Sequence, residues 1–215
     1  MNSFQKILLA FFIVFSIVAG INPRSRFDWF LENCLVILTV AILFIAGRYA
    51  KKYFRLSNIS YALIALYLLL HVLGTHYSYA EVPFGYSLGD LFGTSRNMYD
   101  RLVHFGFGFL LAYPIREVFG RIAGVKGFWS YYLPFDVTLS FSAMYEIFEW
   151  LVAVNVAPAA GIAFLATQGD VWDTQKDMAM AALGSLIAMC TLFCINWWRD
   201  RALKTEVKSA IDLKT

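Results

Sequence analysis

Ionisable side chains occur in pairs one helical turn apart within apolar stretches of this chain of 215 residues. Asp100 and His104 are four residues apart, and Glu146 and Glu149 are three apart, so in helices each pair shares one face. His71 lies in a third apolar stretch. Carboxylates and imidazoles bind divalent metals, and a carboxylate also serves as a general acid or base. The spacing therefore predicts a metal site or an acid–base site.

A third acidic group precedes the last apolar stretch, where Asp170, Asp173 and Asp177 follow the spacing i, i+3, i+7. A charged side chain at the centre of a membrane helix costs about 2.5–3.5 kcal/mol unless it is paired, metal-bound or hydrated. Because four helices bring such groups to one level of the membrane, we expect a shared site that faces the interior of the protein. The predicted catalytic members are Asp100, Glu146, Glu149, Asp173 and Asp177, and the predicted nitrogen ligands of a divalent metal are His71 and His104.

Each of these groups also has a purely structural explanation. Asp100 and Asp173 are placed to cap helix N-termini, where a carboxylate accepts backbone N–H bonds. His71 would bond a backbone carbonyl at the membrane interface. The two glutamates of the second pair would form ion pairs with Arg101 and Lys176. We favour the shared site because all of these groups fall at one level.

The stretches that carry these groups are long and apolar. Hydrophobic residues make up 60% of the chain and charged residues only 15%, which lies outside the usage of soluble domains. About 20 apolar residues cross a bilayer as a helix. We predict an all-α, polytopic transmembrane bundle of about six helices in a single domain, residues 1–198, followed by a basic cytoplasmic tail, residues 199–215. The predicted helices are 4–21, 29–47, 59–77, 102–120, 129–154 and 178–198. The first could instead be a cleaved signal peptide, but we favour an uncleaved anchor.

The distribution of charge predicts the orientation. With the N-terminus in the cytoplasm, 13 of the 18 Lys and Arg residues fall on the cytoplasmic side, as expected for a bacterial inner-membrane protein with both termini inside. Ten of the 15 acids and all three histidines then fall on the outer side. The site is therefore predicted to face the periplasm. The scattered bases form no stripe, so a nucleic-acid partner is not expected.

Two outer connections are unusual. The segment 76–99 is rich in aromatic residues, and the segment 157–167 is apolar but too short to span a membrane. We expect both to lie in the outer interface or to re-enter the protein, where protein or water satisfies the backbone.

Several of these motifs resemble known families. The chain is similar over nearly its full length to the YjdF family of uncharacterised bacterial inner-membrane proteins, through four motif stretches: 71–77, 99–105, 146–150 and 170–178. Helices four to six also resemble VanZ-like membrane proteins, which are linked to glycopeptide antibiotic resistance. Asp100, His104, Glu146, Asp177 and Gly184 match that pattern, whereas Glu149 and Ala181 stand where it has Gln and Asn. The resemblance to the YjdF family implies an inner-membrane location without an assigned activity.

Three classes of function fit these residues. The first is a metal-assisted or acid–base enzyme that acts on a lipid or lipid-linked envelope molecule at the periplasmic face. The second is a protein that binds or transports a cation or a proton, and the third is a structural membrane protein without catalysis. A transport path needs polar residues in the inner half of the bundle, and the sequence offers few: Asp136, Thr138, Ser140 and Ser142. We therefore favour the enzyme.

Overall fold

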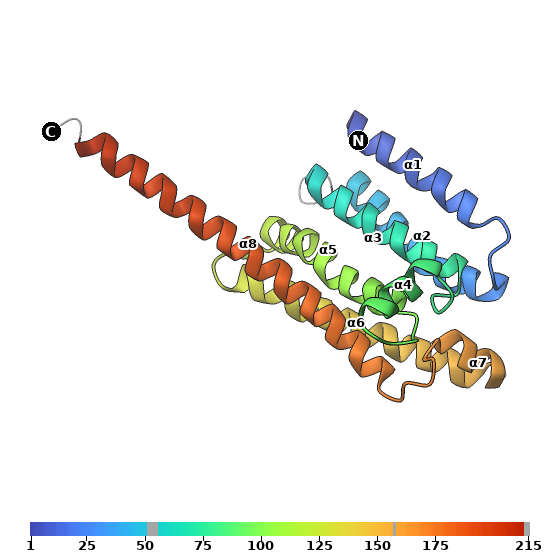
Figure 1. The fold of residues 1–215 in the computed structure, drawn as a ribbon. Coiled ribbons are helices and arrows are strands. Elements are labelled where there is room, and N and C mark those ends of the chain that lie inside the picture. The colour runs from blue at the N-terminus through green and yellow to red at the C-terminus, as the bar shows by residue number, and fades with distance from the viewer. Residues whose placement is uncertain (51–55, 157, 213–215) are drawn as a thin grey trace.

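The computed structural model describes residues 1–50, 56–156 and 158–212, and the regular elements within these ranges are all α-helices. They are α1 (Ser3–Ala19), α2 (Arg26–Tyr49), α3 (Asn58–His76), α4 (Pro83–Leu91), α5 (Tyr99–Ile122), α6 (Trp129–Asn155), α7 (Pro158–Leu165) and α8 (Asp173–Asp212) (Figure 1). Five of them, α2, α3, α5, α6 and α8, are long and apolar enough to cross a membrane, and α1 is a shorter apolar helix of 17 residues. The predicted all-α membrane bundle is confirmed.

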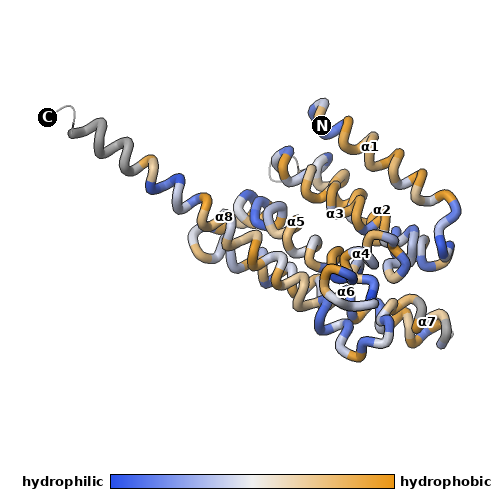
Figure 2. Tube along the Cα trace, viewed as in Figure 1, coloured by the Kyte–Doolittle hydropathy of each residue, from blue (hydrophilic) through white to orange (hydrophobic). Residues whose placement is uncertain are grey.

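The outer surfaces of the long helices are apolar. Figure 2 shows hydrophobic residues along most of each long helix and polar residues near the helix ends. Large side chains such as Ile37, Phe44 and Phe141 lie exposed on these surfaces. A water-soluble protein rarely exposes so much continuous apolar surface, so the bilayer is the medium that suits this fold.

Three helices begin at least three residues earlier than hydropathy indicates. α2 begins at Arg26 rather than at residue 29, α5 at Tyr99 rather than at residue 102, and α8 at Asp173 rather than at residue 178. The N-cap of α5 is Met98, and the Asn97 side chain accepts a hydrogen bond from the Tyr99 N–H. The alternative in which Asp100 caps this helix is therefore wrong, and its carboxylate is available for other contacts.

The two unusual connections contain the short helices. α4 follows the turn after α3, and α7 folds back onto α6. A Cβ atom added at Gly161 of α7 would lie 2.6 Å from the Ala153 carbonyl oxygen, so the two backbones are in direct contact. Ala157, the first residue of the segment predicted to lie in the interface, is outside the described residues.

α5 lies at the centre of the bundle, where it packs on α3 on one side and on α6 and α8 on the other. Its contact with α8 is very close. A Cβ atom at Gly108 would lie 1.9 Å from the Ala181 carbonyl oxygen, and one at Gly184 would lie 2.2 Å from that of Phe105. Glycine lets the two backbones touch at these positions. The first turns of α5 and α8 are thereby brought side by side.

Candidate functional site

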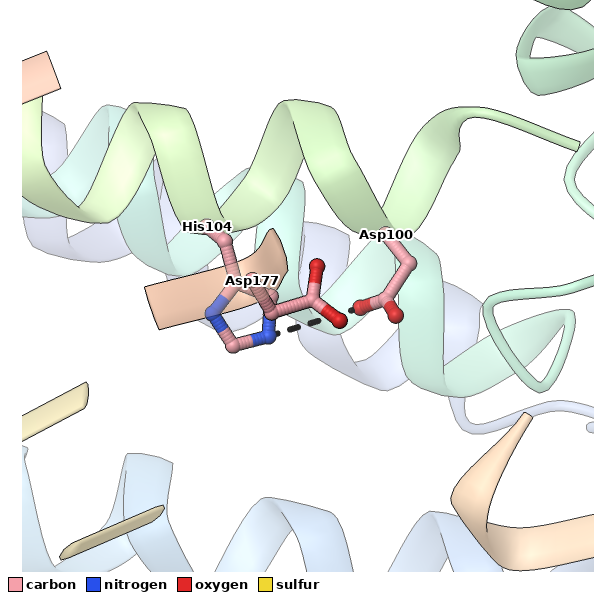
Figure 3. A group of neighbouring side chains, drawn as sticks. All are labelled: Asp100, His104 and Asp177. Carbon is pink, nitrogen blue, oxygen red and sulfur yellow. Dashed lines mark ion pairs between the residues drawn. The ribbon is translucent and has the colours of Figure 1, made fainter. Parts of the chain in front are cut away.

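Three side chains that could hold a metal ion converge where α5 and α8 begin. Asp100 and His104 project from α5 and Asp177 from α8 toward one point (Figure 3). One ligand atom from each lies within 4.8 Å of the others. Glu146 of α6 joins them, because its Oε1 lies 3.6 Å from His104 Nε2, the same distance that separates Nε2 from Asp100 Oδ1.

These separations suit ligands that share an ion. A distance of 3.6 Å is too long for a good hydrogen bond. Ligand atoms about 2.1 Å from a tetrahedral metal lie about 3.4 Å apart. In addition, Glu146 Oε1 and Asp177 Oδ1 are buried and have no hydrogen-bond partner among the described residues. Glu146 and Asp177 are only 6% and 2% exposed, so each offers an unused lone pair in a place where water is scarce.

Arg101 lies between this cluster and two further carboxylates, those of Asp170 and Asp173. It is buried, its Nη1 pairs with Asp177 Oδ2, and its Nη2 lies 2.5 Å from Asp173 Oδ1 and 3.3 Å from Asp170 Oδ2. Arg96 also contacts Asp173 Oδ1, at 2.5 Å. Asp173 is therefore occupied by two guanidinium groups, whereas Asp177 keeps its Oδ1 free.

A chain of hydrogen bonds lies beside the cluster. The Tyr145 hydroxyl donates to Glu32 Oε2 at 2.6 Å, and His71 Nε2 lies 3.3 Å from the Glu32 carbonyl oxygen. Tyr79 Oη lies 2.6 Å from His71 Nδ1. Burial raises the pKa of Tyr79 well above its usual value, so the phenol keeps its proton and donates it to Nδ1. The other nitrogen, Nε2, then carries the proton and donates to the carbonyl.

The position of Tyr79 depends on Gly74, a glycine of the motif stretch that contains His71. A Cβ atom at Gly74 would lie 2.7 Å from the Tyr79 ring, so this ring packs directly on the backbone of α3. The turn that follows the stretch from His71 to Tyr77 thus brings the Tyr79 side chain back to His71.

A small cavity of about 20 Å³ lies at the outer end of the cluster. Its acidic wall is formed by Asp28, Glu32, Asp100 and Glu149, and the C-terminal end of α7 with the residue that follows it, residues 164–166, covers it. A volume of this size holds one water molecule. Asp100 lines both the cavity and the cluster of ligands, so water in the cavity would stand next to a bound ion.

A family model described as "Predicted membrane protein (DUF2238)" matches residues 4–197. The chain belongs to the DUF2238 family. It is also 38% identical over 177 residues to the inner membrane protein YjdF of Escherichia coli (strain K12), and the match covers 82% of each chain. No solved structure matches. This DUF2238 protein is accordingly an inner-membrane protein with several membrane-spanning helices, as predicted.

The fold of the DUF2238 protein brings most of the predicted site residues together. Asp100, His104, Glu146 and Asp177 form one cluster, and Glu149 lines the adjoining cavity. The other two predicted members lie beside it: His71 in the tyrosine network and Asp173 between two arginines.

Sequence reasoning missed four residues of the site in this DUF2238 protein: Glu32, Tyr79, Arg101 and Tyr145. Three of them have a sequence feature that could have revealed them. Glu32 is an acid within an apolar helix, Arg101 lies inside the motif that supplies Asp100 and His104, and Tyr145 precedes Glu146. The structural alternative paired Arg101 with a glutamate, but its partners are the aspartates of α8 and of the segment before it.

Proposed function

We propose that this protein is a metal-dependent hydrolase of the membrane, in which Asp100, His104 and Asp177 hold one divalent cation and Glu146 acts as general base. The observation that carries the proposal is the buried cluster itself. It combines a histidine with carboxylates from three helices, and two of its oxygens have no hydrogen-bond partner among the described residues. Buried acids that served only to stabilise the fold would be expected to have their hydrogen bonds satisfied.

The chemistry follows from the residues of the cluster. A divalent ion held by Asp100, His104 and Asp177 would supply a bound water of lowered pKa. Glu146 Oε1, which lies 3.6 Å from His104 Nε2, would take a proton from that water. Hydrolysis would form a bond from the water oxygen to the substrate and break the bond to the leaving group, which would depart with the proton that Glu146 had accepted.

The surroundings favour a substrate that arrives from the bilayer. The outer end of the bundle exposes Ile162 on α7, and Val171 and Trp172 before α8. Such residues suit the boundary between headgroups and acyl chains. A lipid or lipid-linked envelope molecule could therefore place its polar part at the cluster while its chain remains in the membrane.

Metal analysis tests the site. The protein purified in mild detergent is expected to contain one divalent ion per chain by mass spectrometry. His104→Ala and Asp177→Asn should lose it, because each removes a ligand. His76→Ala and Asp90→Asn serve as controls, since His76 bonds the Ala19 carbonyl and Asp90 lies exposed on α4. A natural protein without metal, or a His104→Ala variant that retains it, would contradict the proposal.

Lipid analysis tests the reaction. Cells that produce the natural protein are compared with cells that produce Glu146→Gln, which keeps the three ligands but removes the base. We expect a lipid species that is consumed by the natural protein to accumulate in the variant. Identical lipid profiles, with metal present in both proteins, would show a cation-binding protein without hydrolysis.

A further inference from the structure

The buried face of α6 is lined mostly by polar residues from Ser130 to Glu146. Its buried residues are four apart and lie on one face: Ser130, Pro134, Thr138, Ser142 and Glu146. The stripe starts at the cluster, where Glu146 faces His104, and reaches the opposite end of the bundle. There Arg116 Nη2 lies 3.3 Å from Ser130 Oγ.

Helices α5 and α8 present matching faces of small or polar residues. On α5 this face follows the same spacing of four: His104, Gly108, Ala112 and Arg116. On α8 it continues inward from the cluster through Asp177, Ala181 and Ser185, all buried. Ser185 lies against α5, since its backbone nitrogen is 2.8 Å from a Cβ atom placed at Gly108. We call these faces of the three helices the polar seam.

Two hydroxyl groups in the polar seam behave differently from those elsewhere in the helices. Ser16, Thr39 and Ser140 each donate to the carbonyl one turn earlier, at 2.8–2.9 Å. Ser142 and Ser185 are 2% and 0% exposed, and their hydroxyls have no hydrogen-bond partner among the described residues. A buried hydroxyl without a partner is costly, and ordered water is its usual partner.

Proline adds an acceptor to the same stripe. Pro134 lies inside α6 and has no N–H, so the Ser130 carbonyl lacks its usual helical donor. The Pro134 carbonyl, one turn farther along the stripe, accepts from the Thr138 hydroxyl. The hydroxyls of Thr138 and Ser130 already donate to the carbonyls of Pro134 and Gly127, so in the stripe they are acceptors for water.

We propose that the polar seam holds a chain of water molecules and carries protons from the level of Ser142 and Ser185 toward the opposite end of the bundle. Along such a chain each oxygen accepts a proton from one neighbour and gives one to the next, so O–H bonds form and break in turn and no bond to carbon changes. The close contact of α5 with α8 at Gly108 and Gly184 leaves no wide pore, which favours protons over hydrated ions. This inference does not require a bound metal, because Ser142 and Ser185 lie inward of the cluster.

Proton flux is the direct test. The full chain is reconstituted into phosphatidylcholine vesicles that enclose a pH-sensitive dye, and a potassium diffusion potential drives proton entry. The natural protein should acidify vesicles faster than protein-free vesicles, and the double variant Ser142→Ala/Ser185→Ala should be slower by at least about fivefold. Ser140→Ala is the matched control, because that hydroxyl bonds its own helix. Flux equal to that of empty vesicles, or a double variant as fast as the natural protein, would overturn the proposal.

A stability measurement covers the case in which the double variant does not fold. Each hydroxyl is removed singly, and the melting temperature is measured in detergent. A serine bonded to water should lower the melting temperature when replaced by alanine, whereas a hydroxyl without any partner should raise it. A rise in both single variants would overturn the proposed water chain, whatever the metal content of the protein.

Discussion

Arg101 is the residue that balances the charge of the site. It is only 5% exposed and contacts Asp170, Asp173 and Asp177. The planar guanidinium offers several donors in a fixed geometry, which lets one side chain bind more than one carboxylate. Because Arg101 pairs with Oδ2 of Asp177, the other oxygen, Oδ1, stays without a hydrogen-bond partner among the described residues.

Replacing Arg101 by methionine should destabilise the protein by about 3–5 kcal/mol, the usual cost of leaving buried charges without a partner. Unfolding in detergent, followed by circular dichroism, measures this change. Arg24→Met is the control: its pair with Glu81 is exposed on both sides, so it should cost less than about 1 kcal/mol. Equal losses in the two variants would contradict this account of Arg101.

At the scale of residues, spacing along one helix was enough to predict part of the site. Asp100 with His104, and Glu146 with Glu149, were found because each pair shares a helix face. The bonds of Tyr145 to Glu32 and of Tyr79 to His71 join different elements, and no local pattern reveals them. The likeness to VanZ-like proteins, which rests on the same spacing, stays a prediction.

The contact between α5 and α8 sets the geometry of the site at the scale of elements. Asp100 and His104 are on one helix and Asp177 on the other, so their separation depends on how closely the two backbones approach. Gly184 touches the Phe105 carbonyl, one residue after His104. A change at this contact would therefore alter the cluster although it removes no ligand.

Gly184→Ala should cost about 1–3 kcal/mol, because a Cβ atom 2.2 Å from a carbonyl oxygen must push the helices apart. It should also weaken metal binding, measured by titration with the ion found in the natural protein. The same substitution at Gly47 meets nothing within 4 Å and should stabilise α2 by up to about 1 kcal/mol. Unchanged stability and affinity in Gly184→Ala would contradict the role of this contact.

Hydropathy predicted the existence of the long helices better than their starts. The first turns of α5 and α8 contain Asp100, Arg101 and Asp173, which lower the hydropathy of these turns. The turns are helical nevertheless because other helices surround them and pair their charges. Partners across the bundle cannot be read from a window of sequence, so the polar starts were predicted as loops.

At the scale of the whole molecule, both ends of the described chain lie toward the same end of the bundle (Figure 1). The excess of Lys and Arg predicts that this end is cytoplasmic. Reporter fusions at the N-terminus and at the C-terminus should both be cytoplasmic, and a tag inserted after the exposed Gly93 should be accessible from the periplasm. A periplasmic C-terminal reporter would reverse the predicted orientation and place the site on the cytoplasmic side.

Helix α8 is far longer than a membrane requires. Its 40 residues extend about 60 Å, roughly twice the hydrocarbon thickness. One end carries Asp173 and Asp177, and the other projects beyond the rest of the molecule (Figure 1). A helix of this length would turn a small tilt near the site into a large displacement of its far end. If an ion pulled Asp177 inward and tilted α8 by about 10° about a point near the site, the far end of the rigid helix would move by about 10 Å. Ion binding on one side of the bilayer would then displace this end on the other side.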